Sequence, residues 1–431
     1  MRRTTTTCRQ CGATVDAAIF QRDGQLFFRS TCAACGSREA PYPEDAGFFD
    51  RVLKIVGPHD GSSRRRFYRH GEKLPPLRGV LLDVTGRCNL HCPHCFASAN
   101  DTLIPEPDLP TLTAWFDTLA RSTSGKLPVV FLQGGEPTLR EDLPAIVRLL
   151  RERGYRLKLV SNGLRLGDAA YVRELKAAGL EWVFLQFDGF SREAYRRLRG
   201  LDLLDEKQRA LENLVQNEMK ILLACMVLSG VNEDQIGPVM DLAIRTPRIQ
   251  QVSFLPASRL GREPENAGLA ATTAFAVMRE LARWSGGRLT PDDFLAFMNI
   301  SKRLWQTTKN ADYQPKTCFY PMALALAERD FMPLNRLLSP RALPLAWRHR
   351  RALGAMLRHV GNLDDMPYNP HLLTMVIEHF RDPDVFDFAD ALHCNKFYIT
   401  ADGLGPSCVY NALERDREAT AISAAGCQGA G

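Results

Sequence analysis

Short apolar runs alternate with amphipathic stretches from residue 79 to about residue 256, and this alternation restricts the fold more than any other feature. The runs are Gly79–Val84, Val129–Gln133, Leu157–Ser161, Val183–Phe187, Ile221–Val227 and Val252–Leu255. Segments between them, such as Glu141–Arg153 and Asp168–Ala178, carry apolar residues at three- and four-residue spacing, which indicates helices. Because strands that alternate with helices form parallel sheets with right-handed crossovers, we predict an α/β fold, an incomplete parallel (β/α)6 barrel.

Residues that can bind metals or ligands follow directly after three of these runs. A cysteine-rich segment, Cys88-Asn-Leu-His-Cys92-Pro-His-Cys95, comes after the first run. Gly134-Gly135-Glu136 follows the second run, and Ser161-Asn162 ends the third. In parallel α/β folds the chemistry collects at the C-terminal ends of the strands. We therefore expect these segments to share one site.

The cysteine segment has the spacing CxxxCxxC, which suits a [4Fe–4S] cluster. Thiolates of Cys88, Cys92 and Cys95 would hold three irons and leave the fourth open to an outside ligand such as S-adenosylmethionine (SAM). A structural zinc loop is the alternative, with His91 or His94 as the fourth ligand. The downstream glycine pair favours the cluster, because two glycines allow close approach to a ligand and Glu136 can accept a hydrogen bond from an ammonium group.

The segment Asp83-Val-Thr-Gly-Arg-Cys-Asn-Leu-His-Cys-Pro-His-Cys-Phe, followed by Gly134-Gly135-Glu136-Pro137-Thr138, resembles the radical SAM superfamily. The resemblance implies reductive cleavage of SAM to a 5′-deoxyadenosyl radical that attacks an unactivated C–H bond. It implies that Gly134, Gly135 and Glu136 bind the SAM amino group. It also places four polar residues near the ribose and methionine: Ser161, Asn162, Gln186 and Asp188.

Further segments narrow the resemblance to the archaeal tetraether lipid synthases, a group also described as pterin-modifying radical SAM methyltransferases. These segments are Leu185–Gly189, Leu198–Leu204, Val231–Gly237, Phe254–Ser258 with Gly261-Arg262, Cys394-Asn395 and Cys408–Asn411. The leading expectation is C–C coupling or alkylation of a lipid-like substrate. The alternative is methyl transfer to a pterin or small biosynthetic intermediate. A non-catalytic iron–sulfur or zinc-ribbon protein for electron transfer or binding is a third possibility, against which the intact Gly134-Gly135-Glu136 argues.

Two CxxCG knuckles stand near the N-terminus, formed by Cys8 with Cys11 and by Cys32 with Cys35. Four thiolates in this pattern make a tetrahedral site for Zn or rubredoxin-type Fe. We predict four regions: a rubredoxin-like knuckle module (1–40), a connector (41–78), the radical SAM partial barrel (79–262) and an irregular C-terminal extension (263–431).

The chain departs from the related group at two places. The group's auxiliary-cluster motif CPxDCGxC is matched by Tyr42-Pro-Glu-Asp-Ala-Gly-Phe-Phe49, which lacks cysteine, so that cluster should be absent. In the C-terminal region, Cys318, Cys394 and Cys408 predict a second [4Fe–4S] cluster with an open or non-cysteine corner, since Met375–Ile377 replaces a further cysteine of the group. Cys427 is an alternative fourth ligand. Three unrelated buried thiols are the competing interpretation, and Cys225 should be a core residue.

Twelve cysteines indicate metal or redox chemistry in a reduced compartment. No apolar run approaches the roughly 20 residues that span a bilayer, and the N-terminus lacks a signal-peptide pattern, so we expect a cytoplasmic protein. A net charge of +6 gives no indication of a nucleic-acid partner. The expected electron donor is a reductase with flavodoxin, or a ferredoxin. The basic amphipathic segment 345–358 suggests either peripheral contact with anionic lipid or a solvated helix face.

Overall fold

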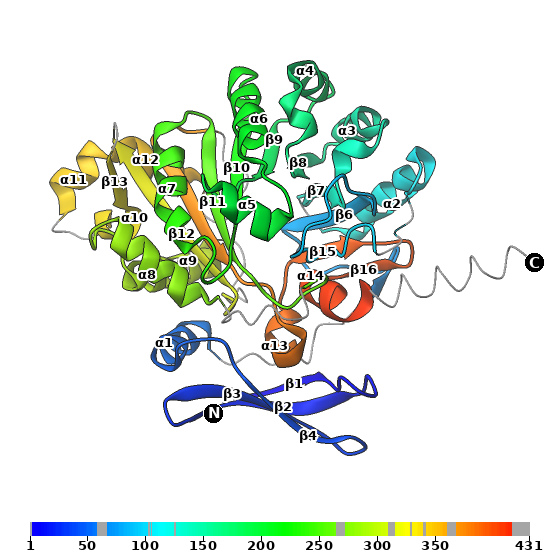
Figure 1. Ribbon diagram of the computed structural model, residues 1–431, viewed down its shortest axis with the longest axis vertical. Helices are drawn as coiled ribbons and strands as arrows, with labels where there is room; N and C mark the ends of the chain where they lie inside the picture. Colours follow the sequence, from blue (N-terminus) through cyan, green and yellow to red (C-terminus); the bar gives the residue numbers. More distant parts are fainter. Residues whose placement is uncertain are drawn as a thin grey trace, which may run out of the picture.

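The computed structural model describes residues 2–57, 67–101, 104, 106–124, 126–263, 272–308, 315–327, 330–338, 342–359 and 368–415 (Figure 1). These residues form a four-stranded antiparallel sheet near the N-terminus and a twelve-stranded main sheet. In the described part of the chain, no helix has the length and hydropathy that a membrane span requires.

All six predicted apolar runs form strands of the main sheet. They are β6 (Gly79–Thr85), β7 (Val129–Gly134), β8 (Arg156–Ser161), β9 (Trp182–Gln186), β10 (Lys220–Val227) and β11 (Ile249–Pro256). These strands are neighbours in sequence order and pair in parallel, as predicted. Helices follow the strands and cover the sheet: α2 (Leu109–Ser122), α3 (Leu143–Glu152), α4 (Ala169–Ala177), α5 (Arg192–Arg199), α6 (Leu204–Gln216) and α7 (Ile236–Arg245).

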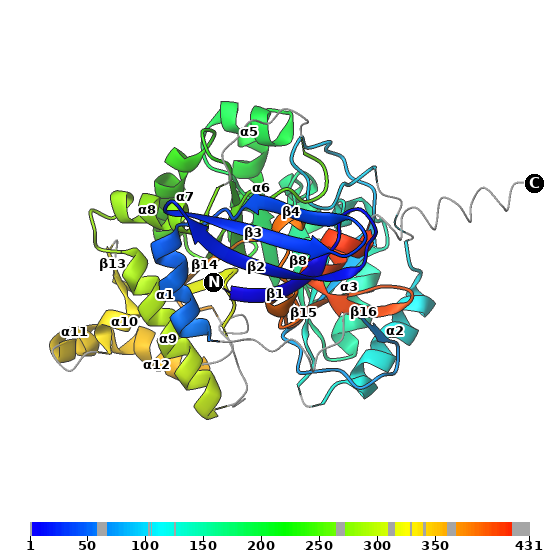
Figure 2. The ribbon, with the colours of Figure 1, turned by 90° about the horizontal axis from the view of Figure 1, so that it is seen from below.

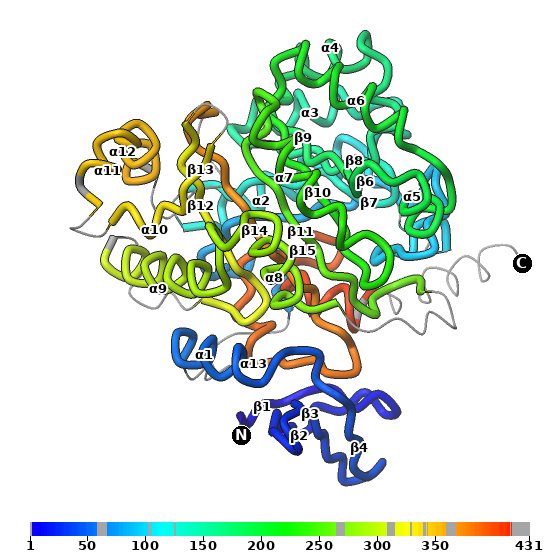
Figure 3. Tube along the Cα trace, turned by 60° about the vertical axis from the view of Figure 1, so that its left-hand side comes forward, coloured from blue at the N-terminus to red at the C-terminus, as the bar shows by residue number. Residues whose placement is uncertain are grey.

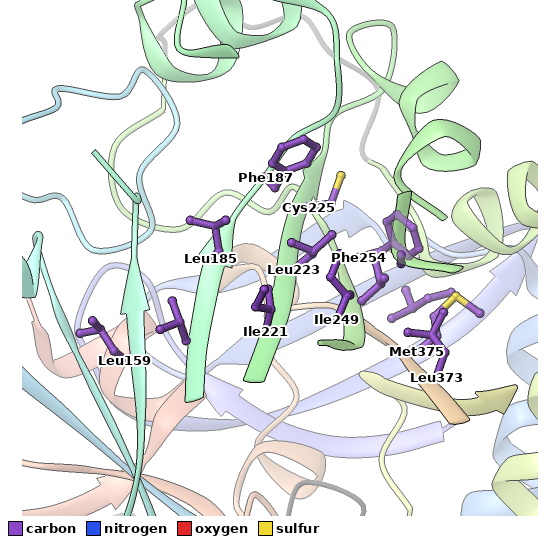
Figure 4. Close-up of a cluster of buried hydrophobic side chains, with 14 of the residues drawn as sticks. Leu159, Leu185, Phe187, Ile221, Leu223, Cys225, Ile249, Phe254, Leu373 and Met375 are labelled. Carbon is purple, nitrogen blue, oxygen red and sulfur yellow. The ribbon is translucent and has the colours of Figure 1, made fainter. Parts of the chain in front are cut away.

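The main core lies between the sheet and these helices. Alternate strand residues such as Leu159, Leu185 and Leu223 point to this side, and Figure 4 shows them in a row of buried side chains that extends to Phe254. Each fully buried side chain of this kind stabilises the fold by roughly 1.5–3 kcal/mol. Cys225 is wholly buried in the same cluster, which confirms that it is a core residue.

The expectation of an irregular C-terminal extension is wrong, because the extension adds strands to both ends of the main sheet. At one end, β14 (Leu372–Glu378) pairs in parallel with β11, followed by β12 (Phe319–Ala327) and β13 (Asp330–Pro333). At the other end, β15 (Lys396–Ile399) pairs with β6, followed by β16 (Gly403–Pro406) and β5 (Tyr68–Arg69). These strands lie far from their partners in sequence, and β5, β13, β15 and β16 have only two to four residues, so local periodicity is a weak signal.

Several helices accompany this extension. They are α8 (Ala274–Trp284), α9 (Pro291–Thr308), α10 (Leu334–Leu337), α11 (Leu343–Arg348), α12 (Arg350–His359), α13 (Phe388–Ala391) and α14 (Ser407–Val409). The basic amphipathic segment thus forms two helices, which meet at His349.

The N-terminal ribbon consists of β1 (Arg2–Thr7), β2 (Thr14–Arg22), β3 (Gln25–Cys32) and β4 (Gly36–Pro41). It lies across one side of the main sheet, with α1 (Ala46–Val56) and α13 beside it (Figures 2 and 3). The connector therefore contains a helix. The ribbon is attached by an apolar cluster that includes Phe28 and Val385, and by an ion pair between Arg2 and the buried Asp387, 3.2 Å apart.

Candidate active site

The loop that carries Cys88, Cys92 and Cys95 is fixed from two sides. Asn100 accepts a hydrogen bond from the Cys88 backbone N–H (2.7 Å) and donates to the Cys88 carbonyl (3.1 Å). On the other side, the Arg262 guanidinium donates to the Cys92 carbonyl (2.9 Å). The backbones of Cys95 and Arg262 also exchange two hydrogen bonds, of 3.1 and 2.9 Å. The geometry of the loop is thus set by residues outside it.

Gly134 and Gly135 bring the end of β7 against the cysteine loop. The Gly135 N–H donates to the Thr85 carbonyl and the Glu136 N–H to the Arg87 carbonyl, both at 2.8 Å. A Cβ atom on Gly134 would lie 2.2 Å from the Thr85 carbonyl oxygen, and one on Gly135 would lie 2.2 Å from the Arg87 oxygen. Glycine is therefore required here by the approach of two backbone segments, in addition to any approach of a ligand.

Glu136 joins the second and third segments that the sequence singled out. Its side chain is buried, and one carboxylate oxygen accepts from the Ser161 hydroxyl at 2.8 Å. The other oxygen accepts from the Asn162 backbone N–H at 2.7 Å. The Asn162 side-chain amide in turn lies 3.9 Å from the Cys88 sulfur. Glu136, Ser161 and Asn162 thus meet beside the cysteine loop, as predicted from their places at strand ends.

Asp188 and Gln186 lie on the next strand end and bind two cations that the sequence analysis missed. Arg199 forms a bidentate pair with Asp188, at 2.8 and 2.9 Å. The Cys92 thiol contributes less than Asp188 to raising the pKa of Arg199. Burial alone would lower the pKa of Arg199, but the Asp188 carboxylate raises it. Lys207 is fully buried and donates to the Gln186 side-chain oxygen at 3.0 Å.

Burial lowers the pKa of Lys207 to about 8. A signal for this residue existed in the sequence: Leu203, Lys207, Leu211 and Leu214 recur at helical spacing, which places the ammonium group on the apolar side of α6. Arg199 belongs to the segment 198–204 that carried the family resemblance.

The thiols of the cysteine loop need a bound cation in order to ionise. Burial raises the pKa of Cys88 to about 11 and also raises the pKa of Cys92, so the thiolate forms need a bound cation. Ligands of different irons in a cluster lie farther apart than ligands of one ion. Among the described residues, no cysteine or histidine of this loop belongs to a group whose ligand atoms all lie within 4.8 Å. The described residues therefore give no support to a zinc loop with His91 or His94.

The ribbon cysteines form the tight group expected for a single metal ion. The sulfurs of Cys8, Cys11, Cys32 and Cys35 all lie within 4.8 Å of one another, and those of Cys11 and Cys32 are 3.7 Å apart. A tetrahedral ZnS4 site with Zn–S bonds of about 2.3 Å has an edge of about 3.8 Å. Backbone N–H groups of Cys11 and Gln10 lower the pKa of Cys8 to about 6, which favours a thiolate ligand.

The C-terminal cysteines gather around the start of β15. Cys394 has its sulfur 3.7 Å from the Lys316 ammonium group and 3.5 Å from the Ser407 hydroxyl. Burial opposes ionisation of Cys394, but Lys316 lowers its pKa below the usual range. Burial raises the pKa of Cys408 to about 12 and also raises that of Cys318. The strands β15 and β16 form a hairpin over residues 396–406, with the Thr400 N–H donating to the Gly403 carbonyl at 2.8 Å. Cys427 lies outside the described residues.

The segment that replaces the auxiliary-cluster motif has a packing role. Phe48 and Phe49 are buried, and the Tyr42 hydroxyl accepts from Arg381 at 3.0 Å. Met375 and Ile377, where the related group has a cysteine, lie in the core on β14.

Comparisons with known proteins agree with this geometry. Residues 82–243 match the Radical SAM superfamily, and residues 1–44 match the HMPTM N-terminal zinc ribbon domain. The chain is 25% identical to 7,8-dihydro-6-hydroxymethylpterin dimethyltransferase of Methanocaldococcus jannaschii, over 96% of this chain and 94% of that protein. It is 32% identical to Fe-coproporphyrin III synthase of Methanosarcina barkeri, over 48% of this chain and 53% of that protein.

Among solved structures, a radical SAM methyltransferase from Sphaerobacter thermophilus matches 63% of this chain and 74% of its own, with 13% identity and a TM-score of 0.39.

Proposed function

The chain is a radical SAM enzyme, and we propose that it transfers a methyl or other alkyl group to an unactivated carbon of a small heterocycle of the pterin class. The observation that carries this proposal is the likeness to a pterin dimethyltransferase along nearly the whole chain, from the ribbon through the C-terminal region. A similarity limited to the barrel would support only the cleavage of SAM and would say nothing about the substrate.

A cavity at the end of β6, the strand that leads into the cysteine loop, supports a small substrate. It has a volume of about 360 Å³ and lies between the end of β6, the start of α2 and the β15–β16 turn. Asp83, Glu106 and Asp108 give it carboxylate groups, while Trp115 and Tyr410 offer aromatic faces. Carboxylates recognise amino-substituted ring edges and aromatic rings stack on flat heterocycles. Each carboxylate already has a protein partner, which is Arg415 for Asp83, Arg87 for Glu106 and the Thr111 N–H for Asp108. The aromatic faces therefore carry most of what the cavity contributes to the proposal.

The residues of this chain divide the work. Cys88, Cys92 and Cys95 would hold a [4Fe–4S] cluster, which with SAM supplies a 5′-deoxyadenosyl radical for hydrogen abstraction. Gly134, Gly135 and Glu136 would present the backbone edge and the carboxylate to the SAM amino group. Ser161, Asn162, Gln186 and Asp188 would line the methionine and ribose side. Arg199 and Lys207 would supply positive charge beneath the thiolates.

Two further metal sites belong to the proposal. The ribbon holds zinc. The 3.7 Å distance between the Cys11 and Cys32 sulfurs and the match to a zinc ribbon domain both support this assignment. Cys318, Cys394 and Cys408 hold a second [4Fe–4S] cluster with one corner not bound by cysteine. Anaerobic reconstitution followed by metal and sulfide counts tests both sites. We expect about eight iron, eight sulfide and one zinc per chain. A sulfide count near four would leave only the SAM cluster.

Product analysis tests the function. The reduced enzyme with SAM, supplied with a cell extract as a source of the alkyl donor, should convert a dihydropterin to species heavier by one or two methyl groups. Profiles of pterins and lipids from a deletion strain, compared with the complemented strain, provide the check in vivo. Loss of methylated pterins with an unchanged lipid profile supports the proposal.

Loss of coupled or alkylated lipids with unchanged pterins would instead support the second candidate, C–C coupling or alkylation of a lipid-like substrate. The family resemblance at residues 79–262 keeps that candidate open. In both cases the electron donor is a reductase with flavodoxin, or a ferredoxin. Peripheral contact with a membrane is a separate proposal, carried by α11 and α12.

A further inference from the structure

A groove with a strongly positive lining lies between α12 and the segment that leads into β14. Its volume is about 490 Å³. The residues that line it are Arg350, Arg351, Gly354, Arg358, Tyr368, Asn369, Pro370 and His371. No carboxylate lines the groove among these residues. The groove lies at the start of β14, whereas the cysteine loop and the strand ends of the candidate active site lie at the opposite ends of the parallel strands.

One wall of the groove is formed by α12, which supplies its arginines. Arg350, Gly354 and Arg358 follow one another at four-residue spacing, so they share a face of α12. The Arg358 guanidinium lies over Gly354, where an added Cβ would be 3.5 Å from the Arg358 Nη1. The Arg351 guanidinium lies 3.4 Å from the His371 imidazole, on the opposite wall. Three arginines that line one groove repel one another, and an anion in the groove relieves that repulsion.

The surrounding sequence offers little compensation for this charge. From Asn335 to Leu363 the chain contains six arginines and no aspartate or glutamate. Arg248 stacks on the Tyr368 ring at 5.0 Å and extends the positive surface on the far wall, where Glu218 pairs with it. Asp364 and Asp365 end this stretch, before the chain reaches the opposite wall of the groove at Tyr368.

Large apolar side chains are exposed beside the groove. Trp347 is 70% exposed, Leu357 57% and Leu345 41%, the largest group of this kind on two successive helices. Arg350 lies over the Trp347 ring at 4.5 Å, which ties the apolar and basic parts of the surface together. Leu357 follows Arg350 by seven residues, or about two helical turns, and thus lies on the same exposed face. Figure 3 shows α11 and α12 at the edge of the molecule, away from the ribbon.

We propose that α11 and α12 form a docking face for an anionic phospholipid surface. The phosphodiester groups of the lipids bind the arginines of the groove, and Trp347 and Leu357 enter the boundary between headgroups and acyl chains. Guanidinium groups match phosphate oxygens bidentately, and tryptophan is favoured at membrane interfaces. Exposed apolar residues next to arginines distinguish this ligand from a free phosphate or a nucleic acid, which would gain nothing from them. The proposal does not depend on which substrate the enzyme alkylates.

Vesicle sedimentation with the reconstituted holoenzyme tests the docking face. We expect binding to vesicles of mixed phosphatidylcholine and phosphatidylglycerol, weak binding to pure phosphatidylcholine, and a loss of binding as salt rises. One arginine near an anionic surface contributes roughly fivefold in affinity. The variant Arg350→Gln/Arg351→Gln/Arg358→Gln should therefore bind about 100-fold more weakly. Trp347→Ala should weaken binding while the salt dependence stays the same, because it removes no charge.

A matched control removes the same charge elsewhere. Arg148→Gln/Arg173→Gln/Arg245→Gln alters exposed residues of α3, α4 and α7 and should bind mixed vesicles within about twofold of the wild type. Both triple variants should form 5′-deoxyadenosine at the wild-type rate, which shows that they fold. Equal loss of binding in both would mean that net charge alone is responsible, and would overturn the proposal. So would a wild-type protein that ignores mixed vesicles, or one that binds a duplex RNA or inorganic phosphate more tightly than vesicles.

Discussion

Arg415 and Asp83 form a buried ion pair, with 2.9 Å between the guanidinium nitrogen and the carboxylate oxygen. Arg415 is the last described residue of the chain and is 1% exposed, while Asp83 lies on β6, five positions before Cys88. Arg415 also donates to the Tyr398 hydroxyl at 2.9 Å and lies over the rings of Tyr398 and Tyr410. The end of the C-terminal region thus supports the strand that leads into the cysteine loop.

Replacing Arg415 should destabilise the protein strongly. Arg415→Met leaves the Asp83 carboxylate buried without its counter-ion, which costs about 3–5 kcal/mol. The double variant Asp83→Asn/Arg415→Met should recover much of this loss, since no charge then remains buried. Urea unfolding of the three proteins measures the effect. If the free energy of unfolding of Arg415→Met stayed within about 1 kcal/mol of the wild-type value, Arg415 would not be the main partner of Asp83.

Gly135→Ala should disturb the cysteine loop. The added Cβ would lie 2.2 Å from the Arg87 carbonyl oxygen, so the backbone before Cys88 must move. We expect reduced iron and sulfide content after reconstitution, together with slower formation of 5′-deoxyadenosine. Gly47→Ala is the control, because its Cβ would meet its nearest atom at 3.5 Å. Full cluster content in Gly135→Ala would contradict the close approach of the two segments.

Glu44 should make stability fall as pH rises above about 5. Burial raises the pKa of Glu44 to about 8, against about 4.5 in the unfolded chain. Between these values the unfolded chain holds fewer protons than the folded one, so the free energy of unfolding decreases with pH. Glu44→Gln should remove roughly 1–2 kcal/mol of this decrease between pH 5.5 and 7.5, less than the full 1.36 kcal/mol per pH unit because the side chain keeps some solvent contact. Urea unfolding at the two pH values measures it, and an unchanged slope in the variant would contradict the assignment.

The ribbon metal should be structural. Cys8→Ser/Cys11→Ser removes two of four ligands, and a module of about 40 residues is too small to fold on its own core. We expect lower soluble yield, loss of the ribbon metal and a lower melting temperature, while the folded fraction still cleaves SAM. A stable double variant whose SAM cluster can no longer be reduced would show that the site relays electrons.

The six central strands were predictable because each is a compact apolar run followed by a helix with clear periodicity. Cys88, Gly135 and Glu136 were predictable as a group for a related reason: parallel strands end at one edge of the sheet, and sequence order fixes which ends are neighbours. The knuckles were predictable from spacing alone, since two CxxC pairs form one tetrahedral site.

The remaining features depend on contacts that periodicity does not report. The strands β14 and β15 are separated from their partners β11 and β6 by more than 100 residues, so nothing local indicates their pairing. Lys207 and Arg262 were missed as site residues because each acts on groups that only the fold brings near. The helical pattern places Lys207 on the apolar side of α6, but it does not indicate that this side faces Gln186. Arg262 follows a strand that is distant in sequence from the cysteines it supports.

Formation of 5′-deoxyadenosine tests the central claim most directly. The reconstituted wild-type protein, kept anaerobic with dithionite and SAM, should produce it, as should the control Cys225→Ser provided that this core substitution leaves the protein folded. The variant in which Cys88, Cys92 and Cys95 are all replaced by alanine should produce none and should lose about four iron and four sulfide per chain, while it keeps its ribbon metal. Production of 5′-deoxyadenosine by that variant at the wild-type rate would contradict the account.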